Sequence, residues 1–353
     1  MAAALLTRRT VLAGLAASAL PGIAPAQAQE VRWSSGSEKP HFVPPAGATD
    51  CHFHTYDKTY PIAKSATLLP DDALPDDYRA LQRRIGTTRG VIIQPSTYGT
   101  DNRLQIASRQ ALGAENFRVV AVVAEDISEA ELRRLDEQGV RGVRFNLGFP
   151  GVLTVNSLPT LAPRLADLGW HCQINMRPKQ IEDNADLLAS LPGRLVFDHL
   201  AQVPQPAGVE SAPYKIIRGL LDRGKTWVKL SGPYVSSKQG APDYADAAAV
   251  AAAYVKAAPE RLVWGSDWLH PSEPKDHKPD DACSTCSPNA RETPPHSSVS
   301  WSITLPSSMV FQRSHHDVLQ SAAPDRDHHL YAASGSIPKA APHRLGGCQP
   351  GWT

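Results

Sequence analysis

The sequence is short of several features that mark whole classes of protein. Its 353 residues hold only five cysteines, too few for a disulfide-built scaffold and odd in number, so at least one thiol stays unpaired within the chain. Its 36 basic side chains nearly balance 35 acidic ones, and this net charge of +1 gives no footprint for nucleic acid or an anionic membrane. Apolar residues at 42% describe a globular protein with a sizeable core.

Residues 1–28 have the pattern of an export signal. Arg8-Arg9 is a twin-arginine motif, an apolar stretch from Val11 to Leu20 follows, and Ala26-Gln27-Ala28 is a small-residue cleavage site. The stretch is too short for a bilayer, which needs about 20 apolar residues, and no other segment is long enough, so we expect no membrane span. We expect export through the twin-arginine machinery to the periplasm or beyond. An ordinary N-terminal anchor helix is the alternative.

The middle of the chain alternates short β-branched runs with amphipathic or alanine-rich stretches. After a lead-in linker at 29–45, eight such runs separated by helical stretches predict a parallel sheet. Residues 29–282 have the length typical of a (β/α)8 TIM barrel, which we assign to 46–282. An open doubly wound sheet is less favoured, because no glycine-rich phosphate loop follows the first run. The predicted strands are Ala48–His52, Gly90–Gln94, Val119–Val123, Val140–Asn146, His171–Asn175, Leu195–His199, Trp227–Leu230 and Leu262–Gly265.

Three helices are predicted by apolar spacing and composition. They cover Ile127–Gln138, Leu161–Leu168 and Tyr244–Ala258, and Ser128 with Glu131 makes a capping pair at the start of the first.

Polar residues follow the ends of nearly all the predicted strands, where a barrel carries its active site. The first strand ends in His52-Phe-His54, the sixth in Asp198-His199 and the eighth in Gly-Ser-Asp267-Trp. Residues two apart on a strand face the same way, so both first-strand imidazoles are expected to face the mouth of the barrel. Convergence of His52, His54, His199 and Asp267 predicts a catalytic site.

These motifs resemble the amidohydrolase superfamily, in particular the amidohydrolase-2 type that includes the 2-pyrone-4,6-dicarboxylate hydrolases and related lactonases. The segments 94–102 (Gln-Pro-Ser-Thr-Tyr-Gly-Thr-Asp-Asn) and 140–146 (Val-Arg-Gly-Val-Arg-Phe-Asn) match as well, so the resemblance covers about 46 to 282. Leu269 departs from it, since the family usually has proline after the tryptophan. The resemblance implies a TIM barrel and a hydrolase.

The resemblance also raises the question of a metal. Zinc-binding members use a histidine at the end of the fifth strand, where this chain has Gln173, Asn175 and Arg177. One ligand is therefore missing, and metal-free catalysis is favoured, as the resemblance to the metal-independent 2-pyrone-4,6-dicarboxylate hydrolases implies. A single divalent metal such as zinc, held by His52, His54 and Asp267 with water, is the open alternative.

Without a metal, the predicted reaction opens a carboxylated lactone or similar cyclic ester. Asp267, with a pKa raised by burial, is expected to activate water, and His52, His54 and His199 to polarise the carbonyl. Guanidinium groups suit the carboxylates of a small-molecule substrate. The substrate-binding candidates are Arg144, Arg141, Arg177, Ser96, Tyr98 and Asn102; of the first two, which face opposite ways, Arg144 is favoured.

Two other functions are compatible with these residues. One is a metal-dependent amidohydrolase or decarboxylase, and the other is a catalytically silent barrel that binds a solute. Supporting or packing roles are expected for Asp198, Trp268, His171, Cys172 and Cys51, and for Lys229 a role in the site and a surface or ion-pair role both stay open.

Residues 283–353 differ from the barrel in composition, being rich in serine, proline and histidine without helical or strand periodicity. With one nucleotide restored before the codon for Cys283, codons for 283–289 can encode Leu-Leu-Asp-Leu-Leu-Ala-Glu, an amphipathic helix. Codons for 300–311 in that frame can encode a segment that resembles the family's Leu-Tyr-Gly-Phe ending. We therefore expect a frameshifted, disordered tail in place of the barrel's last helix.

Overall fold

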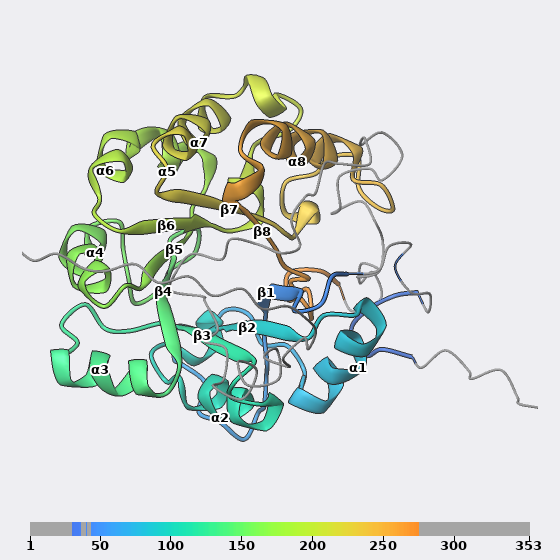
Figure 1. The fold of residues 1–353 in the computed structure, drawn as a ribbon, viewed down its shortest axis with the longest axis vertical. Helices are drawn as coiled ribbons and strands as arrows, with labels where there is room; N and C mark the ends of the chain where they lie inside the picture. The colour runs from blue at the N-terminus through green and yellow to red at the C-terminus, as the bar shows by residue number, and fades with distance from the viewer. Residues whose placement is uncertain (1–29, 37–39, 41–43, 275–353) are drawn as a thin grey trace, which may run out of the picture. The chain divides into compact units, whose positions relative to one another are not determined.

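The computed structural model describes residues 30–36, 40 and 44–274, which form eight parallel strands connected by helices (Figure 1). Each strand pairs with the next along the chain, so the predicted (β/α)8 barrel is confirmed. The strands are β1 (Thr49–Phe53), β2 (Arg89–Ile93), β3 (Phe117–Ala121), β4 (Val140–Asn146), β5 (His171–Asn175), β6 (Arg194–Phe197), β7 (Thr226–Leu230) and β8 (Leu262–Trp264).

Helices surround the strands (Figure 1). They are α1 (Pro75–Ile85), α2 (Arg103–Leu112), α3 (Glu129–Glu137), α4 (Ser157–Asp167), α5 (Pro178–Asp183), α6 (Ala185–Ser190), α7 (Ala212–Asp222) and α8 (Ala245–Ala257). No helix in the described part of the chain is long and apolar enough to cross a membrane. The predicted signal at 1–28, most of the lead-in linker and the tail at 283–353 lie outside the described residues.

Two of the helix starts show how local chemistry sets an element. The Ser128 hydroxyl accepts a hydrogen bond from the Glu131 amide at 3.1 Å, which confirms the predicted cap of α3. Helix α4 begins at Ser157, a turn before the predicted Leu161. Pro159 lies in that first turn, where its missing N–H costs no intrahelical hydrogen bond.

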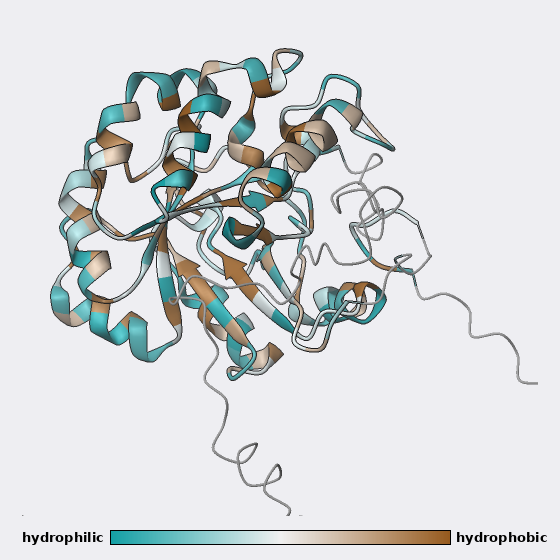
Figure 2. Ribbon diagram, turned by 45° about the horizontal axis from the view of Figure 1, so that its top comes forward, coloured by the Kyte–Doolittle hydropathy of each residue, from teal (hydrophilic) through white to brown (hydrophobic). Residues whose placement is uncertain are grey.

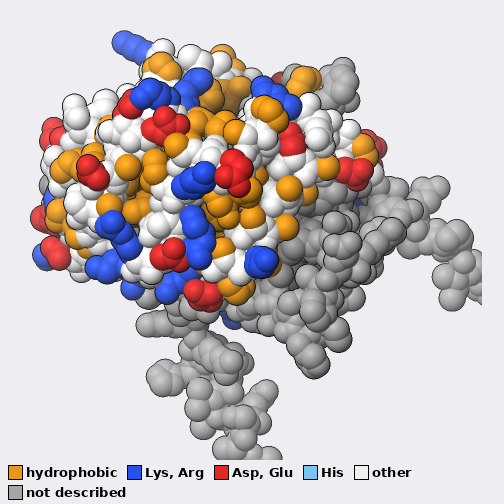
Figure 3. All heavy atoms as spheres, turned by 90° about the horizontal axis from the view of Figure 1, so that it is seen from above, with side chains coloured by type: hydrophobic (Ala, Val, Ile, Leu, Met, Phe, Trp, Pro, Cys, Tyr) orange, Lys and Arg blue, Asp and Glu red, His pale blue; other side chains and the backbone are white. Residues whose placement is uncertain are grey.

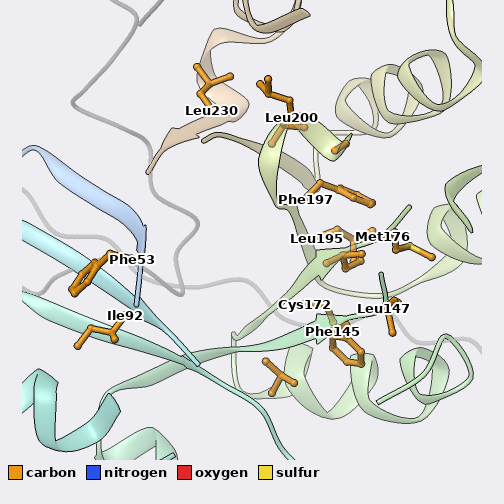
Figure 4. Packing of buried hydrophobic residues seen from close by; sticks show 14 of the residues in the cluster. Phe53, Ile92, Phe145, Leu147, Cys172, Met176, Leu195, Phe197, Leu200 and Leu230 are labelled. Carbon is orange, nitrogen blue, oxygen red and sulfur yellow. The ribbon is translucent and has the colours of Figure 1, made fainter. Parts of the chain in front are cut away.

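Most of the core lies between the strands and the surrounding helices. Alternate strand residues such as Phe53, Ile92, Phe145 and Phe197 point outward and are buried there (Figure 4). Each such side chain contributes about 1.5–3 kcal/mol by leaving water. The strands are mostly hydrophobic and the helices more mixed (Figure 2), while basic, acidic and apolar side chains intermingle on the face in Figure 3.

The barrel closes between β8 and β1 through the segment that follows β8. The Asp267 amide donates to the His52 carbonyl at 2.7 Å, and the His54 amide donates to the Trp268 carbonyl at 2.8 Å. Gly265 permits this approach, because a Cβ atom there would lie 2.5 Å from the Cβ of His52. Closure therefore brings the first-strand histidines and Asp267 together.

Candidate active site

A cavity of about 550 Å³ opens at the carboxyl ends of the strands. This is the end where barrels of this type carry their chemistry. Six of the residues proposed from the sequence line it: His54, Ser96, Arg144, Arg177, His199 and Asp267. The geometry therefore places most of the predicted site around one space large enough for a small molecule.

His52, His54 and Asp267 form a tight buried triangle. The Nε2 atoms of the two histidines are 3.3 Å apart, and Asp267 Oδ1 lies 3.4 Å from each. His52 is fully buried and is not among the residues lining the cavity, contrary to the expectation that both imidazoles face the mouth. His54 and Asp267 therefore present the triangle to the pocket, with His52 supporting them.

The predicted raised pKa of Asp267 was wrong. Burial by itself would raise that pKa, but electrostatic interactions with His199, His54 and His52, which face the carboxylate, outweigh it and hold the pKa well below its usual range. The hydroxyl of Tyr234 also donates to Asp267 Oδ2. Asp267 is consequently ionised and ready to accept a proton at neutral pH.

The two strand-one imidazoles are neutral. Burial is the largest cause lowering the pKa of His52, with the Lys229 charge second, and burial also lowers the pKa of His54. The Nδ1 atom of His54 lies 2.8 Å from the Ile93 carbonyl, which can only accept, so that nitrogen carries the proton. His54 therefore offers an unprotonated Nε2 atom to its neighbours.

His199 lies in a strained turn and not in strand β6, which ends at Phe197. His199, Leu200, Ala201 and Gln202 all have φ between 49° and 56°. This left-handed conformation costs about 1–2 kcal/mol per residue for L-amino acids, and such strain is typical of functional sites. The turn places His199 Nδ1 at 3.1 Å from Ser231 Oγ and 3.9 Å from Asp267 Oδ2.

A network of charged side chains lies below the pocket. Asp198 Oδ2 lies 3.4 Å from Arg144 Nε and 3.2 Å from Gln173 Nε2. Lys229 Nζ lies 3.4 Å from Asp198 Oδ1. Burial would raise the pKa of Asp198, but Lys229 and His52 outweigh it and lower that pKa, so Asp198 is anionic. Burial lowers the pKa of Lys229, and the charge of Asp198 opposes that effect.

Three proposed substrate ligands have other partners and do not line the cavity. Arg141 donates to the Asp136 carboxylate at 2.8 Å, on the opposite face of β4 from Arg144. The Tyr98 hydroxyl bonds the backbone of Asp57, and Asn102 bonds both backbone groups of Val122. These side chains stabilise strands and loops, because their polar atoms form hydrogen bonds with other groups of the protein.

Several pocket residues were not proposed as site residues from the sequence. Amide side chains form a chain in which Gln202 donates to Asn175 and Asn175 donates to Asn146 at 2.8 Å. Arg177, which was proposed from the sequence, lies beside this chain and donates to the Gly148 carbonyl at 2.9 Å. Tyr234, four residues after the end of β7, is another omission; its place after a strand end was the available signal.

The expected packing residues are buried. Burial raises the pKa of Cys51 and of Cys172 to about 12, so neither thiol is reactive at neutral pH. His171 and Trp268 are also buried, and Trp268 Nε1 donates to the Arg32 carbonyl at 2.8 Å.

The spacing of the His52, His54 and Asp267 ligand atoms would suit a metal ion. Separations of 3.3–3.4 Å match the edge of a tetrahedron around zinc, about 3.3–3.4 Å for bonds of roughly 2.0–2.1 Å. A metal also needs an unprotonated Nε2 atom on His52. Two groups face His52 Nδ1 and favour opposite tautomers: Lys229 Nζ at 3.1 Å and Asp198 Oδ1 at 3.3 Å. The positions of the residues fit a metal, and the tautomer of His52 decides whether its Nε2 atom is free to bind one.

Comparison with known proteins finds that the chain matches one protein family. A family model described as Amidohydrolase matches residues 49–292. The 2-pyrone-4,6-dicarboxylate hydrolase of Comamonas testosteroni is 33% identical over 70% of this chain and 85% of its own length. The 4-sulfomuconolactone hydrolase of Rhizobium radiobacter is 34% identical over 74% of this chain and 87% of its own.

A solved structure shares the fold. It is a probable 2-pyrone-4,6-dicarboxylic acid hydrolase from Acinetobacter baumannii, crystallised with citric acid bound. The TM-score is 0.56 at 27% identity, and the match covers 64% of this chain and 85% of that one.

Proposed function

Because the chain belongs to the amidohydrolase family matched at residues 49–292, we propose that this hydrolase opens a carboxylated lactone or a similar cyclic ester with water. The observation that carries the proposal is an ionised carboxylate, Asp267, beside two imidazoles in a pocket that also contains Arg144 and Arg177. The names of the relatives support the same substrate class, since both describe hydrolases of ring esters that bear acid groups.

Asp267 acts as the general base in this proposal. Its carboxylate takes a proton from water as the water oxygen attacks the ring carbonyl carbon. The bond between that carbon and the ring oxygen then breaks, and the proton passes to the leaving oxygen. The hydroxyl of Tyr234 donates to Oδ2 and fixes the orientation of the carboxylate.

His199 is the imidazole best placed to polarise the carbonyl. Its ring lines the pocket, and its Nδ1 atom is engaged by Ser231 at 3.1 Å, so Nε2 is the nitrogen offered to the substrate. A donor fixed in this way stabilises the oxyanion without having to reorganise.

Two arginines hold the acid groups. Arg144 is buried between Asp198 and the Gln94 carbonyl, and Arg177 stands near the rim with its guanidinium 5.6 Å from the Phe149 ring centre. Guanidinium groups bind carboxylates through two parallel N–H donors. Two such groups in one cavity suit a substrate with two anionic substituents.

A substrate pair tests this function. Ring opening of 2-pyrone-4,6-dicarboxylate and of the unsubstituted 2-pyrone is measured as the loss of ring absorbance. We expect turnover of the dicarboxylate and at least a hundredfold lower kcat/KM for the neutral ring. Tight binding of the dicarboxylate without turnover would instead indicate a solute-binding barrel, and equal rates would refute the role of the arginines.

A further inference from the structure

Lys229 is a fully buried cation that the proposed hydrolysis does not use. Its Nζ atom lies 2.8 Å from Gln173 Oε1, 3.0 Å from the Cys51 carbonyl and 3.1 Å from His52 Nδ1. An ammonium group has three donors and no acceptor, and these three neighbours are arranged to receive them.

The orientation of Gln173 supports this assignment. The Nε2 atom of Gln173 donates to Asp198 Oδ2 at 3.2 Å, which turns its Oε1 atom toward Lys229. The Cys51 carbonyl can only accept. Two donors of Lys229 are therefore taken by oxygen atoms, and the third meets His52 Nδ1.

The groups that face His52 Nε2 favour the same tautomer, with the proton on Nε2. His54 donates from Nδ1 to the Ile93 carbonyl, so its Nε2 atom has a lone pair. This lone pair lies 3.3 Å from His52 Nε2, and Asp267 Oδ1, also an acceptor, lies 3.4 Å from His52 Nε2. A proton on His52 Nε2 can be directed at either acceptor, whereas a lone pair on that atom would face a lone pair at both contacts.

We propose that Lys229 is a positioning residue that holds His52 in the tautomer protonated at Nε2, and that it thereby prevents His52, His54 and Asp267 from binding a divalent cation. In this tautomer His52 has no lone pair at Nε2 and acts as a donor to the two groups that face the substrate. The Lys229 charge adds repulsion toward any cation.

Asp198 is the competing partner that makes the proposal testable. Its Oδ1 atom lies 3.3 Å from His52 Nδ1, close enough to accept a proton from that nitrogen. A histidine that donates from Nδ1 to a carboxylate presents Nε2 to a metal, the usual arrangement of metal-ligating histidines. Without Lys229, His52 should therefore carry its proton on Nδ1 and donate it to Asp198. The Nε2 atom of His52 would then be free to bind a metal.

The test measures the tautomer and metal affinity separately from hydrolysis, so it does not depend on the proposed substrate. In the wild type, side-chain ¹⁵N–¹H correlation spectra, assigned by the signal lost in His52→Asn, should show His52 protonated at Nε2. Lys229→Met should move the proton to Nδ1 and tighten zinc binding, measured by calorimetry, at least tenfold, the lower end of the usual effect of groups that support metal ligands.

Arg144→Met is the matched control. It also removes a cation that contacts Asp198, but Arg144 does not contact His52, so it should tighten zinc binding much less. In Lys229→Met, an added Asp198→Asn substitution should reverse the gain.

Two results would overturn the proposal. One is a wild-type His52 protonated at Nδ1, a measurement that needs no Lys229 variant to fold. The other is a folded Lys229→Met protein whose zinc affinity and His52 tautomer match the wild type.

Discussion

The two ends of the barrel use the same kinds of charged residue in opposite ways. Near the amino ends of the strands, Arg109 and Arg118 each donate to the Phe117 carbonyl at 2.8 Å, and Arg141 donates to the Val140 carbonyl. Near the carboxyl ends, Asp267 and His54 contact each other and line a cavity. Charged side chains bond backbone carbonyls near the amino ends of the strands, whereas near the carboxyl ends they line the cavity where a ligand can bind.

The difference appears in which groups the charged side chains contact. A hydrogen bond from a charged group typically stabilises the fold by about 1.5–3 kcal/mol, and the amino-end arginines make several. Near the carboxyl ends, the Oδ1 atoms of Asp198 and Asp267 are buried and face His52 nitrogen atoms at 3.3 and 3.4 Å. These carboxylates therefore lie against side chains of the site instead of backbone groups.

Replacement of Asp267 should give the largest effect. Asp267→Asn removes the proposed base but keeps the shape of the side chain, so kcat should fall about 10²-fold or more, the usual range for general-base catalysis. Steady-state kinetics with the dicarboxylated lactone measure this, and a thermal melt establishes that the variant is folded. Near-normal turnover would remove Asp267 from the mechanism.

The two arginines of β4 offer a matched pair for the two faces of one strand. Arg144→Met should raise KM for a carboxylated substrate about 10–100-fold, the equivalent of one charge-assisted hydrogen-bond pair, with little effect on a neutral analogue. Arg141→Met should leave KM unchanged and lower the melting temperature instead. The comparison fails if both variants change KM equally, or if Arg144→Met weakens both substrates alike.

Acid should destabilise both ends through neutral buried histidines. Burial lowers the pKa of His171 to about 3, and also lowers the pKa of His52 and His54. Below about pH 6.5 the unfolded chain therefore binds more protons than the folded one. The contribution of these neutral histidines to the free energy of unfolding should be complete above that pH. Below it, the free energy of unfolding should fall by about 1.4 kcal/mol per pH unit for each histidine.

Urea unfolding at pH 7.5, 6.5 and 5.5 measures this dependence. His171→Asn, at the amino end of β5, should reduce the slope by one histidine's share with the kinetics unchanged. A free energy of unfolding that stays constant over this range would contradict the buried neutral state.

Loss of the Tyr234 hydroxyl should have the smallest effect. Tyr234→Phe removes the donor to Asp267 Oδ2, and kcat should fall severalfold, up to about tenfold. Because the hydroxyl favours the charged carboxylate, its loss should raise the pKa of Asp267 and move the acid limb of kcat/KM to higher pH. An acid limb that stays in place would show that Tyr234 acts elsewhere.

The sequence predicted the elements of the barrel well because buried strands and amphipathic helices leave strong patterns. Strands β4 and β5 begin and end where the apolar runs do, and Ser128 caps α3 as its spacing predicts. The family motifs also predicted that His54, His199 and Asp267 would meet. Closure of β8 on β1 joins His54 to Asp267, and the turn after β6 brings His199 Nδ1 to 3.9 Å from Asp267 Oδ2.

The remaining site features depend on contacts that no local pattern encodes. Strand alternation could not show that His52 lies beneath His54, because β1 has an irregular register between Asp50 and Phe53. The left-handed turn at His199 consists of residues that rarely adopt it. The low pKa of Asp267 arises from histidines distant in sequence, and the Tyr98 and Asn102 side chains bond backbone groups that only the fold brings near.

A single turnover in ¹⁸O-labelled water tests the central claim most directly. Excess wild-type enzyme is mixed with the dicarboxylated lactone, and the product is analysed by mass spectrometry. Activation of water by Asp267 predicts one ¹⁸O atom in the newly formed carboxylate of the product and none in the enzyme. An unlabelled product, with or without label in Asp267, would contradict the account, because the ring would then have isomerised or been opened by an enzyme carboxylate.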